Sequence, residues 1–231
     1  MNGYFITGTD TNVGKTYVTC TLARRARELG QRVFAFKPIE TGCSPGPDGG
    51  LVGADQELLA GAAGGWQQHD LRGVYRFPMP AAPLVAAEAI VSSIDLGVVV
   101  RTARRGSESG PTLTLVEGAG GWRVPITPTA DMSALARELA LPVVVVARAG
   151  LGTINHSLLT LEAVARDGLQ VAALVLSQRG DDDPTFVESN REQIKRRWPG
   201  RILILASSPS PLDALVVPRG TSRVPAGERS T

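Results

Sequence analysis

The residues of this chain best suited to chemistry lie in a glycine-rich loop at residues 8–16, Gly-Thr-Asp-Thr-Asn-Val-Gly-Lys-Thr. The loop joins a short apolar stretch, residues 4–6, to residues 15–29, where apolar side chains recur at helical spacing. A glycine loop in this setting presents backbone N–H groups and a helix N-terminus to phosphate oxygens. We therefore expect it to bind a nucleoside triphosphate, with Lys15 at the β and γ phosphates and the Thr16 hydroxyl on Mg²⁺.

The spacing of this loop differs from the common phosphate-binding pattern, because five residues rather than four separate Gly8 from Gly14. The loop is therefore a longer variant of that pattern. The alternative is an ordinary strand-to-helix turn with a solvated Lys15. A lysine at the positive end of a helix is electrostatically unfavourable unless an anion binds there, which favours the phosphate-binding interpretation.

Two other strand-like stretches lead into residues that suit phosphoryl transfer. In open parallel sheets, ligands bind beyond the carboxyl ends of the strands. One stretch ends in Lys37, followed closely by the Thr41 hydroxyl, and another runs into Glu117. Lys15 and Lys37 together would neutralise a phosphoryl group during its transfer. The alternative for Lys37 is a strand-end lysine that reaches solvent.

A magnesium site is also expected from the residue types. Mg²⁺ prefers oxygen ligands and usually combines a few protein groups with phosphates and water. Thr16, Asp55 and Glu117 can supply the protein groups. Asp55 could instead serve only to complement the dipole of the helix that it opens. Glu117 follows an apolar strand and would be costly to bury without a cation, so we expect it near the metal.

Composition and charge argue against several classes of protein. The 24 basic and 22 acidic residues nearly cancel to a formal net charge of +2, which gives no sign of a nucleic-acid-binding surface. No apolar run approaches the roughly 20 residues needed to span a membrane. The 2 cysteines form no CxxC pair, and with 2 histidines a histidine-rich metal site is not expected. With no signal peptide evident, we expect a reduced, cytoplasmic protein.

Apolar strand-like stretches alternate with helical patterns, which predicts an α/β fold with a mainly parallel central sheet and helices on both faces. We expect strands at 4–6, 32–37, 112–116, 142–147, 171–176 and 201–206. We expect helices at 15–29, 55–62, 82–91, 95–105, 131–139, 154–167 and 184–198. Residues 1–217 should form a single domain, in which 42–53 and the segment after 206 are irregular and only 212–217 of that segment can pack. Residues 218–231 are expected to be a disordered tail.

Four motifs in their order along the chain resemble the dethiobiotin synthetase family. Besides the glycine loop they are Lys-Pro-Ile-Glu-Thr-Gly at 37–42, Val-Glu-Gly-Ala-Gly-Gly-Trp at 116–122 and Leu-Gly-Thr-Ile-Asn-His at 151–156. The resemblance extends over about residues 4–176. It implies a P-loop NTPase-like, homodimeric cyclo-ligase of biotin synthesis. Such an enzyme uses ATP and Mg²⁺ to join CO₂ to 7,8-diaminopelargonic acid and close a ureido ring.

The chemistry of that family implies roles for individual residues. One substrate amine captures CO₂ as a carbamate, the γ-phosphate is transferred to the carbamate, and the second amine then closes the ring as phosphate leaves. Lys37 would stabilise the carbamate and the migrating phosphoryl group, and Lys15 would bind the β and γ phosphates. Thr11 and Thr41 would hydrogen-bond the carbamate or substrate. Asn155 would meet the substrate carboxylate, in its own or the partner subunit's site, or would simply cap a helix.

The resemblance also implies a set of nucleotide and metal contacts. The implied nucleotide contacts come from Asn12, Val13, Gly14, Lys15, Thr16, Tyr17, Asp55, Glu117, Gly118, Ala119, Gly120, Ser177 and Gln178. Thr16, Asp55 and Glu117 would hold Mg²⁺. Two positions depart from the family's pattern. Asn12 stands where an acidic residue is common, and Ser177 stands where an asparagine often reads the adenine edge, so we expect altered base recognition.

Two other functions stay open from the sequence. A partitioning-type P-loop ATPase switch would share the glycine loop, but such proteins usually place another lysine early in the loop, where this chain has Thr9. A nucleotide-binding module without ligase activity would fit the departures at Asn12 and Ser177. The retention of Lys37 and Glu117 argues against such a module.

Overall fold

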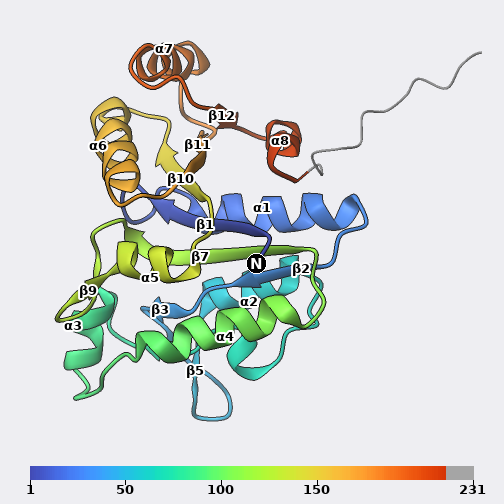
Figure 1. The fold of residues 1–231 in the computed structure, drawn as a ribbon, viewed down its shortest axis with the longest axis vertical. Helices are drawn as coiled ribbons and strands as arrows, with labels where there is room; N and C mark the ends of the chain where they lie inside the picture. Colours follow the sequence, from blue (N-terminus) through green and yellow to red (C-terminus); the bar gives the residue numbers. More distant parts are fainter. Residues whose placement is uncertain (217–231) are drawn as a thin grey trace, which may run out of the picture.

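The computed structural model describes residues 1–216, which are built around a six-stranded parallel sheet (Figure 1). The strand order is β12-β11-β10-β1-β7-β2. The strands are β1 (Gly3–Gly8), β2 (Val33–Phe36), β7 (Leu113–Gly121), β10 (Val143–Arg148), β11 (Val171–Ser177) and β12 (Ile202–Leu205). All of them were expected from the sequence, so the predicted α/β fold class is confirmed. The predicted tail at 218–231 lies outside the described residues.

Helices cover both faces of this sheet (Figure 1). One face is covered by α1 (Lys15–Glu28), α2 (Ala54–Ala62) and α8 (Asp213–Val216). The other face is covered by α4 (Leu96–Glu108), α5 (Met132–Leu139), α6 (Thr153–Arg166) and α7 (Pro184–Lys195). Successive side chains of a strand point to opposite faces, so Val143 and Val145 pack in one cluster while Val144 and Val146 pack in the other.

Shorter elements connect the main strands and helices, and of these the sequence predicted only the helix α3, at 82–91. The paired short strands are β3 (Ile39–Thr41) with β6 (Tyr75–Phe77), β4 (Ser44–Pro45) with β5 (Leu51–Val52), and β8 (Pro125–Thr127) with β9 (Ala130–Asp131). The short helices are η1 (His69–Leu71), α3 (Pro83–Glu88) and η2 (Ser210–Leu212). Strands of two or three residues are too short to show an alternating pattern, so residues 42–53 were expected to be irregular.

Two predicted boundaries were wrong in ways that matter for the site. The strand expected at 112–116 continues to Gly121, so Glu117 and the small residues after it belong to β7 itself. Their pairing with β1 continues the strand, with a left-handed Gly120 at φ 64° and Gly8 opposite Gly121 after a shift of register. The helix expected at 82–91 ends at Glu88, and Val91 adopts a left-handed conformation with φ 53°.

The end of the described chain packs against the first helix, as expected for 212–217. Leu212, Leu215 and Val216 are buried in the same cluster as the apolar side chains of α1. The Tyr4 hydroxyl donates to the carbonyl of Leu215 at 2.9 Å, which ties this end to β1. Within residues 1–216, no helix is long and apolar enough to cross a membrane.

Two helical glycines differ in what surrounds them, which gives a test of the packing. A Cβ at Gly106 of α4 would come 2.1 Å from Cζ of Phe34, whereas a Cβ at Gly61 of α2 would meet no atom within 4 Å. Gly106→Ala should therefore destabilise the protein by about 1–3 kcal/mol through overpacking. Gly61→Ala should stabilise it by about 0.5–1 kcal/mol, because alanine favours helices more than glycine does.

Urea unfolding of the two variants beside the parent protein measures both changes. Similar stabilities for the two variants would contradict the close packing of Phe34 on α4.

Candidate active site

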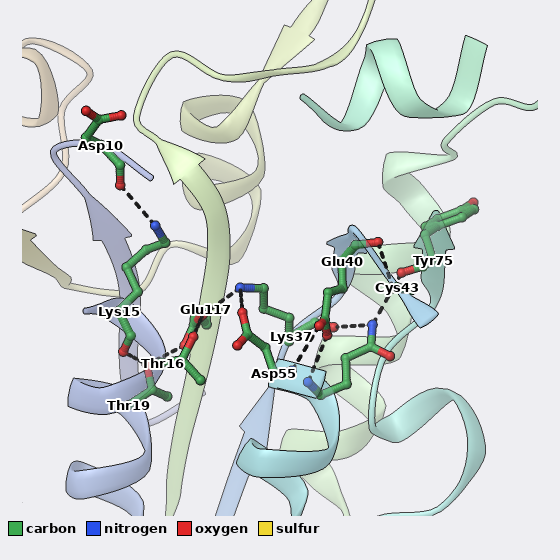
Figure 2. A network of polar contacts seen from close by, with 11 residues as sticks. Asp10, Lys15, Thr16, Thr19, Lys37, Glu40, Cys43, Asp55, Tyr75 and Glu117 are labelled. Carbon is green, nitrogen blue, oxygen red and sulfur yellow. Dashed lines mark hydrogen bonds and ion pairs between the residues drawn. The ribbon is translucent and has the colours of Figure 1, made fainter. Parts of the chain in front are cut away.

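The starts of α1 and α2 meet the carboxyl ends of β1 and β2 and the middle of β7 at one edge of the sheet (Figure 2). A cavity of about 530 Å³ lies there. The sequence-predicted residues that line it are Thr11, Asn12, Gly14, Lys15, Thr16, Tyr17, Lys37, Thr41, Asp55, Ala119 and Gly120. Most of the predicted site therefore gathers around one cavity, although its members lie far apart in sequence.

The glycine loop enters α1 through Gly14, which adopts a left-handed conformation with φ 97°. Glycine alone reaches this conformation without strain. A Cβ at Gly14 would also come 2.5 Å from Oγ of Ser177, at the end of β11. The backbone geometry and the close neighbour both require glycine here, and they bring the loop backbone to the cavity where an anion could approach it.

Lys15 is buried at the start of α1, and no carboxylate of residues 1–216 lies within hydrogen-bonding distance of its ammonium. Its Nζ donates to the backbone carbonyl of Asp10 at 3.1 Å (Figure 2). Burial, assisted by the neighbouring charge of Lys37, lowers the pKa of Lys15 to about 8. The ammonium of Lys15 is thus a destabilised cation that a bound anion would stabilise.

Glu117 is fully buried in β7, and both oxygens of its carboxylate accept hydrogen bonds. Oε1 accepts from Nζ of Lys37 at 2.6 Å and from Oγ1 of Thr16 at 2.9 Å, and Oε2 accepts from Oγ1 of Thr19 at 2.7 Å. A buried carboxylate is tolerated only with such partners. Within the described chain, the cation that pairs with this carboxylate is Lys37, and the expected contact of Glu117 with a metal ion stays a prediction.

Lys37 joins the two acidic residues of the site. Its Nζ lies 2.7 Å from Oδ2 of Asp55 and 2.6 Å from Oε1 of Glu117. Burial would lower the pKa of Lys37, but the two carboxylates raise it well above its usual value. Burial likewise opposes ionisation of Asp55, and the Lys37 ammonium overcomes this and lowers the pKa of Asp55. Lys37 and Asp55 are therefore ionised at neutral pH. Lys37 is buried, so the alternative of a solvent-exposed Lys37 is wrong.

The donor types at this edge fit a magnesium ion. The hydroxyl of Thr16 and the carboxylates of Asp55 and Glu117 are all oxygen donors, and Lys37 already connects the two carboxylates. Mg²⁺ uses a few such groups and completes its shell with phosphates and water. Residues 1–216 contain no cluster of three or more histidine, cysteine or acidic side chains suited to a metal. The three oxygen donors would leave the remaining positions around such an ion to phosphates and water.

Several predicted residues do not line the cavity. Glu117 lies beneath it, and Val13 is buried in the hydrophobic cluster under α1. A Cβ at Gly118 would point toward Phe5 and Met132 in the core. Asn155 is exposed on the first turns of α6, and Gly152 rather than Asn155 occupies the N-cap of that helix.

The two residues predicted near the base lie behind the glycine loop. Ser177 is buried against Gly14, as described above. The side-chain amide of Gln178 donates to the carbonyl of Asp182 at 3.4 Å, within the loop that follows β11. Ser177 therefore brings the end of β11 against the glycine loop, whereas the Gln178 contact stays within the loop after β11.

Sequence reasoning missed three residues at the site. Thr19 bonds to Glu117, and its spacing of one helical turn from Thr16 could have revealed it. Arg179 lines the cavity and its guanidinium donates to the carbonyl of Asn12 at 3.0 Å. Glu40 also lines the cavity and bonds to the start of α2. Glu40 lies within the motif at 37–42, but no residue pattern marks its contact with α2 or the contact of Arg179 with the glycine loop, because both depend on how separate loops meet.

Comparison with known proteins agrees with this geometry. A family model described as an AAA domain matches residues 2–211. The ATP-dependent dethiobiotin synthetase BioD of Anaeromyxobacter dehalogenans (strain 2CP-C) is 43% identical over 196 residues, which cover 85% of each chain. The enzyme of the same name from Pseudomonas aeruginosa (strain UCBPP-PA14) is 37% identical over 203 residues, 88% of each chain.

Solved structures show the same fold at low identity. In the MinC:MinD cell division protein complex of Aquifex aeolicus, the matched chain gives a TM-score of 0.57 at 16% identity, covering 94% of this chain and 86% of that one. Chloroplast FtsY from Physcomitrella patens gives 0.53 at 14% identity, covering 94% of this chain and 65% of its own. These likenesses confirm the predicted fold.

The contact between Lys37 and Glu117 predicts a strong coupling in stability. Lys37→Met removes the cation and leaves the Glu117 carboxylate buried, so it should destabilise the ligand-free protein by about 3–5 kcal/mol. The double variant Lys37→Met/Glu117→Gln buries no unpaired charge at 117 and should recover most of that loss. Urea unfolding at neutral pH measures both, with Lys195→Met on exposed α7 as the control. If the double variant loses as much free energy of unfolding as Lys37→Met and Glu117→Gln lose in total when measured singly, the coupling is contradicted.

Proposed function

The chain belongs to the ATP-dependent dethiobiotin synthetase family, and we propose that its cavity closes the ureido ring of dethiobiotin from 7,8-diaminopelargonic acid and CO₂. Sequence identity over most of the chain supports the reaction. The observation that supports the catalytic arrangement is the group of Lys15, Lys37, Asp55 and Glu117 at one end of the phosphate-binding loop. Two buried cations and two carboxylates suit a reaction that moves a phosphoryl group.

The reaction creates negative charge at each stage, and the cavity offers donors for it. An amine of the substrate adds to CO₂ and loses a proton to give a carbamate. A carbamate oxygen then bonds to the γ-phosphorus as the bond to ADP breaks. The second amine attacks the carbamate carbon, phosphate departs and a proton is released. Catalysis of such transfer rests on positioning and charge stabilisation.

The lining residues divide between the two substrates. The backbone of the loop and Lys15 would bind the β and γ phosphates, while Lys37, which stays protonated, would stabilise the carbamate and the phosphoryl group in transfer. Thr11 and Thr41 line the same cavity and would hydrogen-bond the substrate. Ala119 would approach it through its backbone. The phosphate donor and its acceptor would thus lie on either side of Lys37.

The reaction also requires Mg²⁺ in this proposal. Thr16, Asp55 and Glu117 would hold the ion, since they supply the oxygen donors of the cavity floor. A bound Mg²⁺ would supply charge neutralisation for the phosphates. Lys37 now contacts both carboxylates, so in this arrangement the ion and the Lys37 ammonium compete for the same oxygens.

A homodimer is the assembly that best accounts for Asn155. This residue does not line its own cavity, and it lies on α6 beside two exposed apolar side chains, Leu151 at 87% and Leu159 at 58% exposure. Burial of such side chains favours association. Pairing through this part of α6 would cover both leucines and bring Asn155 toward the substrate carboxylate in the partner subunit.

The decisive test supplies 7,8-diaminopelargonic acid, bicarbonate, Mg²⁺ and ATP to the purified protein. Mass spectrometry should detect dethiobiotin, and ADP and phosphate should form in equal amounts with it. The matched control, Lys37→Ala, should make no dethiobiotin while it still binds ATP, because Lys15 and the loop remain. Hydrolysis of ATP by the parent protein without dethiobiotin would contradict the proposed function.

The lowered pKa of Lys15 predicts how ATP affinity depends on pH. In the free protein this lysine loses its proton as the pH rises through about 8, and bound phosphates would raise that pKa. ATP binding should therefore take up protons above pH 8, and the affinity should fall by up to about tenfold per pH unit.

Calorimetry of ATP binding in buffers of different ionisation enthalpy measures this proton uptake. The matched control is Lys15→Arg, because its guanidinium stays charged throughout this range and should remove the pH dependence. An equal slope in Lys15→Arg would show that another group titrates.

A further inference from the structure

Glu40 is a buried acidic residue at the site for which neither the sequence nor the proposed reaction provides a role. It lies in β3, close after Lys37, and is 7% exposed at the cavity wall. Its Oε1 accepts from the backbone N–H of Asp55 at 2.9 Å, and its Oε2 accepts from that of Gln56 at 2.9 Å (Figure 2). Both carboxylate oxygens are therefore directed at the first turn of α2.

This contact replaces the cap that α2 lacks. The N-cap residue is Gly53, which has no side chain to accept hydrogen bonds from the helix start. The second and third N–H groups of a helix need an acceptor, and those of α2 belong to Asp55 and Gln56. Glu40 satisfies both from another part of the chain, and its negative charge complements the positive end of the helix.

The glycine at position 53 makes room for this arrangement. Gly53 has an ordinary extended conformation with φ −90°, so the backbone does not require glycine. A Cβ there would instead come 2.4 Å from Oε2 of Glu40. The capping carboxylate therefore depends on a glycine at the N-cap, and this is an observation independent of the hydrogen bonds themselves.

A second contact fixes the same helix to the end of β2. The side-chain amide of Gln56 donates to the backbone carbonyl of Lys37 at 3.1 Å. The start of α2 is thus held at Lys37 and at Glu40, on either side of Pro38 and Ile39. The side chains of Lys37 and Asp55 then face each other at 2.7 Å across this connection.

We propose that Glu40 is a positioning residue that holds Asp55 in the site by capping α2. It acts on the helix backbone rather than on the substrates. The functional consequence rests on the proposed function, in which Asp55 helps to hold Mg²⁺. Without the cap, the first turn of α2 would loosen and the Asp55 carboxylate would no longer face Lys37 and Glu117.

The test compares ATP affinity with and without Mg²⁺, which does not require product formation. In Glu40→Ala, affinity without Mg²⁺ should change little, because Lys15 and the glycine loop are untouched. The gain in affinity that Mg²⁺ provides should fall about tenfold, as is typical when a residue supporting a metal ligand is lost. Gly53→Ala should cause the same loss, because its methyl group displaces the Glu40 carboxylate.

A rescue variant separates positioning from direct contact with ligand. Removing the Glu40 carboxylate makes room at position 53, so Glu40→Ala/Gly53→Ser places a local capping hydroxyl on the same N–H groups. This double variant should regain both stability and the Mg²⁺-dependent affinity. The matched control is Asp95→Ala, which removes the side-chain cap of α4, accepting from the N–H of Val98 at 3.2 Å. It should lower stability and leave the Mg²⁺-dependent affinity unchanged.

Three outcomes would overturn the proposal. The first is an unchanged Mg²⁺ effect in folded Glu40→Ala. If that variant does not fold, Gly53→Ala with an unchanged Mg²⁺ effect is the second. The third is a double variant that regains stability but not affinity, since Glu40 would then act on the ligand itself. A parent protein that binds ATP more tightly with Mg²⁺ yet makes no dethiobiotin would contradict the proposed function alone.

Discussion

The burial of one charge, the carboxylate of Glu117, constrains the whole carboxyl edge of the sheet. Taking a carboxylate out of water costs several kcal/mol unless cations and hydrogen-bond donors surround it. Here Lys37 comes from the end of β2, and Thr16 and Thr19 come from successive turns of α1. The strand β7 must therefore lie between β2 and β1, and α1 must begin just where the glycine loop ends. The phosphate-binding loop and the second lysine are parts of one charge-balanced unit.

The two lysines of that unit differ in their hydrogen-bond partners and in their pKa. Lys37 has two carboxylate partners and remains a cation throughout the physiological range, whereas Lys15 has a backbone carbonyl and a pKa of about 8. The carboxylates of the protein thus stabilise the Lys37 ammonium, whereas the Lys15 ammonium would be stabilised by a bound ligand. In the proposed reaction, Lys15 would attract phosphate to the loop, and Lys37 would provide a permanent positive charge where the acceptor reacts.

The sequence was sufficient for the features that repeat a simple pattern. Continuous apolar runs predicted the sheet strands, and the glycine loop predicted the place of Lys15 at the start of α1 beside the cavity, because strand and helix periodicity are local properties. The continuation of β7 through Glu117 was missed, since glycines usually indicate a turn, whereas here the segment pairs with β1 through a shift of register and a left-handed Gly120. The cap by Glu40 and the contact from Arg179 were missed because they join loops whose approach is decided by packing.

Ser177 illustrates how a distant residue limits what the loop can tolerate. Its hydroxyl lies where any side chain at position 14 would have to go, so the glycine at 14 makes room for the Ser177 side chain. The two positions therefore share one small volume and restrict each other's side chains. A serine at this place is explained by steric fit to the phosphate-binding loop, whichever base the nucleotide carries. Any larger residue selected at 177 to contact a base would have to direct its side chain away from α1.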